Sequence, residues 1–370
     1  MAKYYKKVPF LYYFSYLCGK KKMILHIFNP EHDLALASNL ANFTAPHAGR
    51  QLRSDLGYLP ALWAAADDWV LVESVGQARR AYGRLRARVG GGPCQFVDKH
   101  QLGRLGITEV RPWGWDLALR SFLLRYGVEA VPDEEAVVTI RDLSHRRQAV
   151  RLLRELQMPG TVGYSACAEE MAEVREFLRH HGRIVVKAPW SSSGRGLRFI
   201  DGSLNGYHEG WIRHVVEQQQ CVVLEPYFNK VKDFGMEFES DAEGIVRYRG
   251  LSLFETKHGA YTGNLIASEE VKLEAISRYV SAGLLSDVKE RLLTLLTDLC
   301  RARYAGPLGV DMMIVASPSH DGFLLHPCVE VNLRRTMGHA ALSVAPFADG
   351  FPRVMSIVLT DKYRIQIRKQ

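Results

Sequence analysis

The chain has 370 residues, of which 47% are hydrophobic and 24% are charged, and its formal net charge is +8. This length and apolar content are enough for a packed core of two or three domains or lobes, which excludes a wholly disordered chain. The positive charge favours an anionic ligand or a basic solvated surface. We do not expect nucleic acid as a partner, because the sequence contains no recognisable nucleic-acid-binding module.

The six cysteines are scattered and form no C-x-x-C pair, so we expect reduced thiols in a cytoplasmic protein. Residues 1–22 hold lysines on both sides of a short apolar run that tyrosines interrupt. This run is too short for a membrane span and is followed by no cleavage site, so we expect a disordered leader and no membrane partner.

Residues 23–28 (MILHIF) predict the first strand of an α/β lobe. Open α/β sheets bind ligands at the carboxyl ends of their strands, which makes the next polar residues, Glu31, His32 and Asp33, candidate substrate residues. A turn in which Asp33 caps the following helix is the alternative. Strands at 69–73 and 95–97 alternate with helices at 55–66, 77–89 and 117–126. We therefore predict a parallel-sheet lobe over residues 23–135.

A second candidate site begins with the apolar strand 184–186, which ends at Lys187. The small polar loop that follows contains Ser192, Ser193, Gly194 and Gly196. Backbone N–H groups of such a loop can approach phosphate oxygens closely, since glycine has no Cβ in the way, and the lysine adds a positive charge. The sequence is not a Walker A loop, and a surface hairpin with an incidental lysine is the alternative.

Two later strands, at 309–315 and 324–333, carry hard oxygen ligands. Asp311 lies near the start of the first, and Glu330 and Asn332 are two residues apart on the second, so they share a face. Arg334 continues that face. Two acids, an amide and a guanidinium suit Mg²⁺-bridged polyphosphate, because the metal can keep substrate phosphates as its other ligands. An ordinary salt-bridged strand is the alternative.

With these residues in order, the chain resembles the ATP-grasp superfamily over about residues 140–345. Lys187 looks like the family's phosphate-contacting strand lysine, and residues 222–228 look like the hinge beside adenine. The E-x-N-x-R pattern is present as Glu330-Val331-Asn332-Leu333-Arg334. The resemblance implies catalytic roles for Arg334 and Lys187. It implies the metal ligands Asp311, Glu330 and Asn332, and the nucleotide contacts Glu225, Tyr227, Phe228 and Asp233.

One residue departs from the family pattern. Arg146 stands where the family usually has a second, earlier lysine, and arginine contacts phosphate in a forked geometry. Lys257, in a polar loop at 255–264, is an anion-contact candidate, with a plain surface loop as the alternative. Arg335 and His339 are further substrate candidates, and a packing role at a helix start is the alternative for His339. Residues 360–370 predict a frayed basic tail.

The resemblance implies an α/β fold in which an N-terminal parallel-sheet lobe precedes two β-rich lobes that clasp ATP. We expect the ATP-grasp domain at residues 136–350 and a C-terminal tail at 351–370. The implied activity is ligation of a small-molecule carboxylate to an amine or thiol through an acyl-phosphate, with ATP and Mg²⁺ or Mn²⁺ as cofactors. A phosphotransferase and a non-enzymatic nucleotide-binding regulator are the alternatives. The sequence does not indicate the oligomeric state.

Overall fold

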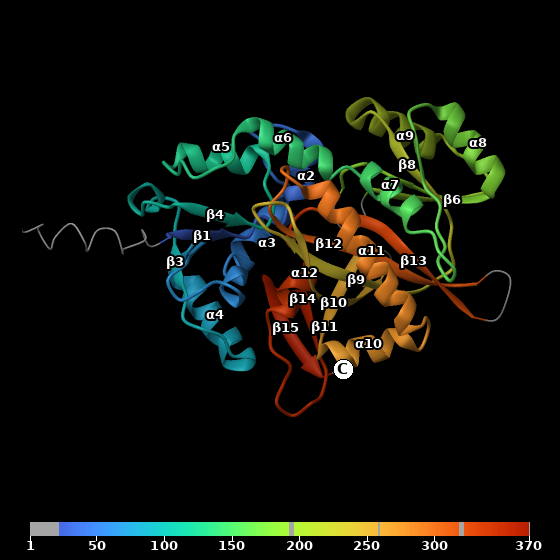
Figure 1. Cartoon of the computed structure of the whole chain (residues 1–370). Coiled ribbons are helices and arrows are strands. Elements are labelled where there is room, and N and C mark those ends of the chain that lie inside the picture. The colour runs from blue at the N-terminus through green and yellow to red at the C-terminus, as the bar shows by residue number, and fades with distance from the viewer. Residues whose placement is uncertain (1–21, 192–195, 258–259, 318–321, 370) are drawn as a thin grey trace, which may run out of the picture.

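The computed structural model describes residues 22–191, 196–257, 260–317 and 322–369, so all but the last residue of the predicted leader lies outside it. Within these ranges the strands form a parallel four-stranded sheet, an antiparallel four-stranded sheet and an antiparallel seven-stranded sheet. Figure 1 shows the parallel sheet and its helices at one end of the molecule and the small antiparallel sheet at the other. The seven-stranded sheet lies between them. The α/β fold class is confirmed.

The parallel sheet, whose surroundings we call the N-terminal lobe, has the strand order β3-β2-β1-β4. Its strands are β1 (Ile24–Ile27), β2 (Trp69–Leu71), β3 (Gln95–Val97) and β4 (Glu109–Pro112), and its helices are α2 (His32–Ser38), α3 (His47–Leu56), α4 (Val75–Val89) and α5 (Leu117–Arg125). The predicted helix at 55–66 is wrong. The helix α3 ends at Leu56, and only a 3₁₀ turn (Leu59–Leu62) follows, because Pro60 has no N–H to continue a helix.

The small antiparallel sheet has the order β5-β8-β6-β7. Its strands are β5 (Ala166–Ala168), β6 (Arg183–Lys187), β7 (Leu197–Asp201) and β8 (Val222–Pro226), and its helices are α8 (Met171–His181) and α9 (Gly206–Gln219). Two helices, α6 (Glu134–Leu143) and α7 (Arg147–Glu155), connect it to the N-terminal lobe. Residues 161–164 form no strand, since Thr161 makes one isolated bridge and Gly163 has φ +140°.

The seven-stranded sheet runs β13-β12-β9-β10-β11-β14-β15 and holds the largest core. Its strands are β9 (Lys230–Ser240), β10 (Val246–Lys257), β11 (Ala260–Ile266), β12 (Gly306–Ala316), β13 (Phe323–Asn332), β14 (Arg353–Leu359) and β15 (Tyr363–Lys369). The helices α10 (Glu269–Ser277), α11 (Ala282–Cys300) and α12 (Met337–Leu342) pack against it, and α7 packs against β13. As the helical spacing of its leucines predicts, α11 buries Leu292, Leu296 and Leu299 in the core.

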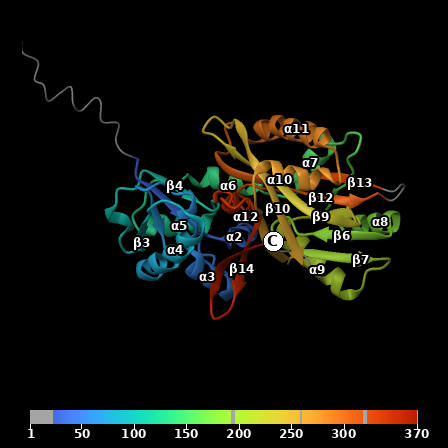
Figure 2. The same cartoon turned by 90° about the horizontal axis from the view of Figure 1, so that it is seen from below.

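The C-terminal residues do not form the frayed tail that their basic composition predicts. The strand β15 pairs with β14 along its whole length, from Arg353 opposite Lys369 to Leu359 opposite Tyr363. On its inner face, Tyr363, Ile365 and Ile367 pack against a core cluster that includes residues of the N-terminal lobe. Figure 2 shows β14 beside α3 of that lobe, and β15 contacts α3. The alternating apolar residues of β15 therefore stabilise this segment as a strand despite its basic composition.

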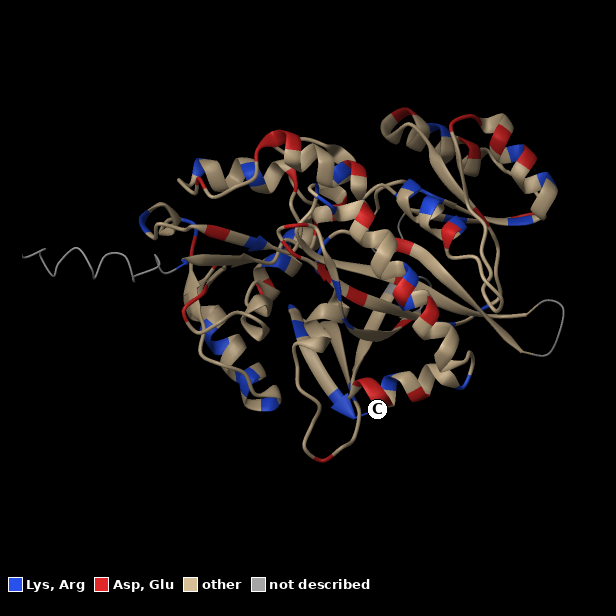
Figure 3. Ribbon diagram, viewed as in Figure 1, with Lys and Arg blue, Asp and Glu red and all other residues tan. Residues whose placement is uncertain are grey.

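Charged residues of both signs are spread along the described chain (Figure 3). The helices α4 and α5 contain arginines and no acid. Among the described residues, no helix has the length and apolar character that a membrane crossing needs.

Candidate functional site

Lys187 and Glu225 form a buried ion pair on the small antiparallel sheet. Lys187 on β6 stands opposite Val223 of β8, so Glu225 is its diagonal neighbour on the same face. The Nζ atom of Lys187 lies 2.5 Å from Oε1 of Glu225, and each residue is 5% exposed. Burial of both charges requires this pairing, because either one alone would be strongly destabilising. The pair places a cation at the end of β6, directly before the candidate phosphate loop.

Arg146 connects three segments that are far apart in the sequence. Its guanidinium donates hydrogen bonds to the carbonyl oxygen of Ala188, to Oγ of Ser191 at 2.9 Å and to Oε1 of Glu330 at 2.8 Å. The side chain is buried, and its Nε has no hydrogen-bond partner among the described residues. Arg146 thus brings a second cation to the point where β6, the loop after it and the end of β13 meet.

Only part of the candidate phosphate loop is described. Ser192, Ser193 and Gly194 lie outside the described residues, whereas Ser191 and Gly196 lie within them. A Cβ on Gly196 would lie 2.2 Å from Cβ of Ser191. Because no such approach is tolerated, this position requires glycine and the two ends of the loop pack closely together.

The three candidate metal ligands lie together. Asp311 on β12 stands directly opposite Glu330 on β13, and Nδ2 of Asn332 donates to Oδ2 of Asp311 at 3.3 Å. Like charges directly opposite one another on a sheet repel. Burial and the neighbouring Glu330 raise the pKa of Asp311 to about 8. Among the described residues, no group of three or more His, Cys, Asp and Glu side chains is arranged to hold a metal ion. Two repelling carboxylates beside an amide nevertheless fit a Mg²⁺ ion that takes its other ligands from phosphate oxygens.

Arg334 pairs with a residue of the N-terminal lobe. Its Nε and Nη2 atoms each donate to a different oxygen of Asp33 on α2 at 2.8 Å. Burial opposes its charge, but the Asp33 carboxylate outweighs burial and the pKa of Arg334 lies above its ordinary value. Asp33 does not cap α2, whose N-cap is Glu31. A small cavity of about 10 Å³ is lined by both residues together with Ser191, Glu330 and Asn332.

The three candidate nucleotide contacts after β8 have partners within the protein. The N–H of Tyr227 donates to the carbonyl oxygen of Arg183 at 2.9 Å, and the Arg183 guanidinium lies 4.1 Å from the Tyr227 ring centroid. The Phe228 ring packs edge-on against His326. The carboxylate of Asp233 accepts a hydrogen bond from Lys230 at 2.6 Å. Tyr227 therefore offers an exposed ring, but its N–H is already used.

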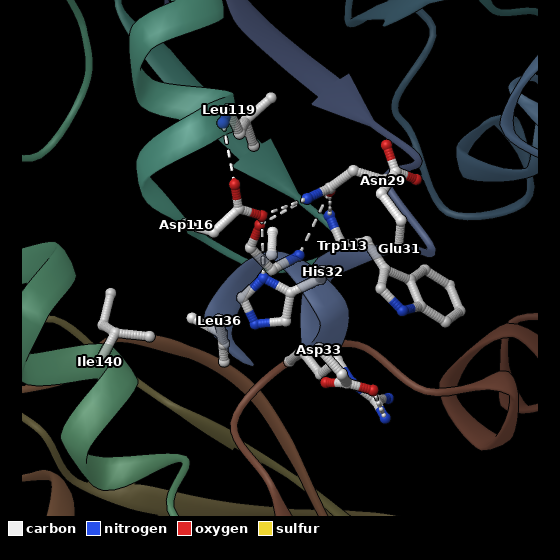
Figure 4. Close-up of polar contacts among 12 residues, drawn as sticks. Asn29, Glu31, His32, Asp33, Leu36, Trp113, Asp116, Leu119 and Ile140 are labelled. Carbon is white, nitrogen blue, oxygen red and sulfur yellow. Dashed lines mark hydrogen bonds and ion pairs between the residues drawn. The ribbon is translucent and has the colours of Figure 1, made fainter. Parts of the chain in front are cut away.

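The candidate substrate residues are dispersed. Figure 4 shows His32 directed at Asp116, which its Nδ1 approaches to 3.1 Å, and Asp33 directed elsewhere. Arg335 lies 4.5 Å from the Trp63 ring centroid, and burial lowers its pKa to about 10. His339 is buried at the start of α12, where it completes a capping box with Thr336. Lys257 ends β10, and its side chain is not described. Among the described side chains of this set, none forms a hydrogen bond or ion pair with Glu330.

Asp33, a substrate candidate of the sequence analysis, belongs to this region as the partner of Arg334. A residue that the sequence analysis did not single out is His326 on β13, whose two ring nitrogens are buried and have no hydrogen-bond partner among the described residues. The sequence carried a signal for His326, because it lies four residues before Glu330 on a strand of period two.

Comparisons with known proteins agree with this geometry at the level of the fold. No family model and no curated protein matches the sequence. The structure resembles biotin carboxylase from Campylobacter jejuni, solved with a β,γ-ATP ligand, at a TM-score of 0.51 and 12% identity over 91% of this chain and 75% of that one. It also resembles the biotin carboxylase domain of 2-oxoglutarate carboxylase from Hydrogenobacter thermophilus, solved with MgADP, ADP and bicarbonate. Here the TM-score is 0.51 and the identity 11%, over 91% of this chain and 74% of that one.

A third similar structure is N5-carboxyaminoimidazole synthetase from Staphylococcus aureus in complex with ADP. Its TM-score is 0.48 and its identity 14%, over 92% of this chain and 84% of that one. The two biotin carboxylase structures support the ATP-grasp fold for this chain.

Proposed function

We propose that the chain is an ATP- and Mg²⁺-dependent ligase that joins a small-molecule carboxylate to an amine or thiol through an acyl-phosphate. The observation that carries this proposal is the Arg146–Glu330 contact at 2.8 Å. It joins the start of α7, the phosphate loop and the acidic end of β13 at one point, where a polyphosphate would find cations on one side and metal ligands on the other.

Each residue has a distinct task under this proposal. Lys187, Arg146 and the loop between Ser191 and Gly196 hold the phosphates of ATP. Glu225 pairs with the buried Lys187 and holds it in position, and it borders the adenine with the exposed ring of Tyr227. Asp311, Glu330 and Asn332 would hold Mg²⁺, which when bound offsets the negative charge of the phosphates.

The chemistry needs positioned charges more than a protein nucleophile. An oxygen of the substrate carboxylate attacks the γ-phosphorus, and the bond from that phosphorus to the β-phosphate oxygen breaks, so ADP leaves. Arg334, beside Glu330 and Asn332 in the small cavity, offsets charge on the transferring group. The amine or thiol then attacks the acyl carbon and loses its proton, and phosphate departs with the oxygen that the carboxylate supplied.

The test is a turnover screen of the whole chain with ATP, Mg²⁺ and pooled carboxylates, with and without pooled amines and thiols. ADP and phosphate are both measured, and Glu330→Gln is the matched variant. We expect ADP release that needs both substrates and is lost in Glu330→Gln. ADP release with a carboxylate alone and no free phosphate would instead identify a phosphotransferase. ATP binding without turnover in every mixture would contradict the proposal.

A further inference from the structure

A second, larger cavity lies in the N-terminal lobe, away from the residues that the proposed function uses. Its volume is about 310 Å³, at the lower end of the roughly 300–1,000 Å³ range of small-molecule pockets. Its lining includes residues that directly follow parallel strands: Phe28 and Asn29 after β1, Val72 and Glu73 after β2, and Lys99 shortly after β3. The carboxyl ends of parallel strands are where open α/β sheets bind ligands.

One wall of this cavity carries an unpartnered carboxylate oxygen. Glu31 is only 7% exposed, and its Oε1 atom accepts a hydrogen bond from Arg53. Its Oε2 atom is buried and has no hydrogen-bond partner among the described residues. Figure 4 shows the Glu31 side chain pointing away from Asp33, so the start of α2 separates this cavity from the nucleotide site. A buried carboxylate oxygen of this kind costs free energy unless a donor is supplied.

The other walls carry cations without carboxylate partners. Arg50 on α3 and Arg125 at the end of α5 line the cavity, and within the described ranges neither lies within salt-bridge distance of an acid. Lys99 also lines it and makes only a distant contact with the Tyr126 ring, at 5.9 Å. Arg53, in contrast, is shared by Glu31 and by Glu73, which its Nε approaches to 3.9 Å. The cavity therefore presents positive charge without a carboxylate partner, together with the free oxygen of Glu31 and the half-exposed carboxylate of Glu73.

Asp116, another acid of the lining, already has hydrogen-bond partners. Asp116 accepts hydrogen bonds from Asn29 Nδ2 at 3.2 Å and from the Leu119 N–H at 2.8 Å, and its Oδ2 atom also lies 3.1 Å from His32 Nδ1 (Figure 4). The remaining lining is mostly apolar and includes Phe43 and Phe122, together with the polar residues Asn42 and Thr44. A ligand that fits these walls has an anionic group, a hydrogen-bond donor and an apolar body.

We propose that this cavity binds a small zwitterion of the apolar α-amino acid class. Its carboxylate would contact Arg50, Lys99 and Arg125, its ammonium group would donate to Oε2 of Glu31, and its side chain would lie against Phe43 and Phe122. This binding site is separate from the nucleotide site, and it requires neither ATP nor turnover.

The test is calorimetric titration of the whole chain, without nucleotide, with L-leucine, L-methionine and L-phenylalanine. We expect at least one of them to bind with a Kd of about 1 mM or tighter. For the amino acid that binds, the N-acetylated form and the amine that lacks the carboxylate should each bind at least about tenfold more weakly, because each loses one charge contact. The proposal is overturned if none of the three amino acids binds this tightly.

Variants of the lining residues test whether the amino acid binds in this cavity. Arg50→Gln combined with Arg125→Gln should weaken amino acid binding at least about tenfold, whereas Arg79→Gln on the exposed face of α4 should not change it. Glu31→Gln should weaken binding of the amino acid but not of its N-acetylated form. Ala118→Phe, which fills the cavity from α5, gives a second check if Glu31→Gln does not fold. Binding that survives both the paired arginine changes and Ala118→Phe would place the ligand elsewhere and contradict the proposal.

Discussion

Arg334 and Asp33, which are 301 positions apart in the chain, form a two-bond ion pair with both donor–acceptor distances at 2.8 Å. The pair joins the segment after β13, which carries the candidate metal ligands, to α2 of the N-terminal lobe. An arginine in the E-x-N-x-R pattern therefore has a structural partner in addition to its proposed catalytic role. This contact makes the first helix of the N-terminal lobe part of the proposed nucleotide site.

Asp33→Asn should lower the free energy of unfolding by about 3 kcal/mol at neutral pH, because it leaves Arg334 largely buried without its partner. Burial alone would raise the pKa of Asp33, but Arg334 lowers it overall. The stabilisation is therefore present above the ordinary carboxyl pKa and is lost as the pH falls through the lowered value. Denaturant unfolding of both proteins at neutral and at acidic pH checks this. Asp361→Asn, in an exposed pair with Arg364, is the control and should have little effect.

His326 should make the protein less stable in mild acid. Burial lowers its pKa from 6.5 to about 4, so the folded state holds the ring neutral while the unfolded state takes up a proton. Its contribution is complete above the unfolded pKa and falls by about 3 kcal/mol as the pH drops from 6.5 to 4. His326→Leu should flatten this part of the stability profile, and His214→Gln on the exposed side of α9 should not. An unchanged profile in His326→Leu would show that the acid sensitivity arises elsewhere.

The buried Lys187–Glu225 pair should determine nucleotide affinity. Changing both residues together, as Lys187→Met with Glu225→Gln, avoids leaving one charge buried without its partner. We expect this double variant to remain folded and to bind MgATP about 100-fold more weakly by calorimetry, because the phosphates lose a direct cation. Lys362→Met is the control on the exposed turn between β14 and β15. Equal affinity of the double variant and the parent for MgATP would show that Lys187 does not contact the nucleotide.

The facing acids predict an effect of metal on stability. Asp311→Asn removes a carboxyl group whose ionisation burial and Glu330 disfavour in the folded state, so the metal-free variant should melt at a higher temperature than the metal-free parent. Addition of Mg²⁺ with ADP should reverse the order, because the parent gains a ligand that the variant binds poorly. Thermal unfolding with EDTA and with MgADP measures both effects. The same ligand-induced shift in both proteins would argue against a metal bound by Asp311.

The C-terminal strand should contribute to stability through its inner face. Ile365 packs against the core cluster that includes N-terminal-lobe residues, whereas its neighbour Arg364 pairs only with Asp361 at the surface. Ile365→Ala should therefore cost about 1–2 kcal/mol, and Arg364→Ala should cost less than about 0.5 kcal/mol. Denaturant unfolding of the two variants gives the comparison. Equal costs would mean that β15 is not anchored by apolar packing.

The sequence predicted the elements whose patterns are local. The apolar run before Lys187 became β6, and the alternating pair at Glu330 and Asn332 lies on β13 as expected. The strand at Tyr363–Lys369 was missed because each of its apolar residues is flanked by charge, and only pairing with β14 and packing on the N-terminal lobe make it a strand. The local pattern of charged residues contains no information about these long-range contacts.

The site shows the same limit. Residue types and order indicated Lys187, Asp311 and Glu330, but their partners come from distant segments. No local pattern links Arg334 to Asp33 or Arg146 to Glu330, because these contacts depend on how the sheets and lobes pack together. His339 lies beside the motif in the sequence, but its side chain is buried in the capping box of α12 with Thr336.

The most direct test of the proposed ligase uses carboxylates whose carboxyl oxygens are labelled with ¹⁸O, supplied as a pool with ATP, Mg²⁺ and pooled amines. An acyl-phosphate route moves one labelled oxygen from the carboxylate to the phosphate that is released. We therefore predict that mass spectrometry detects ¹⁸O in the inorganic phosphate that the parent protein releases. Glu330→Gln should release no labelled phosphate. Phosphate that is released without label, or no phosphate from any mixture, would contradict the account.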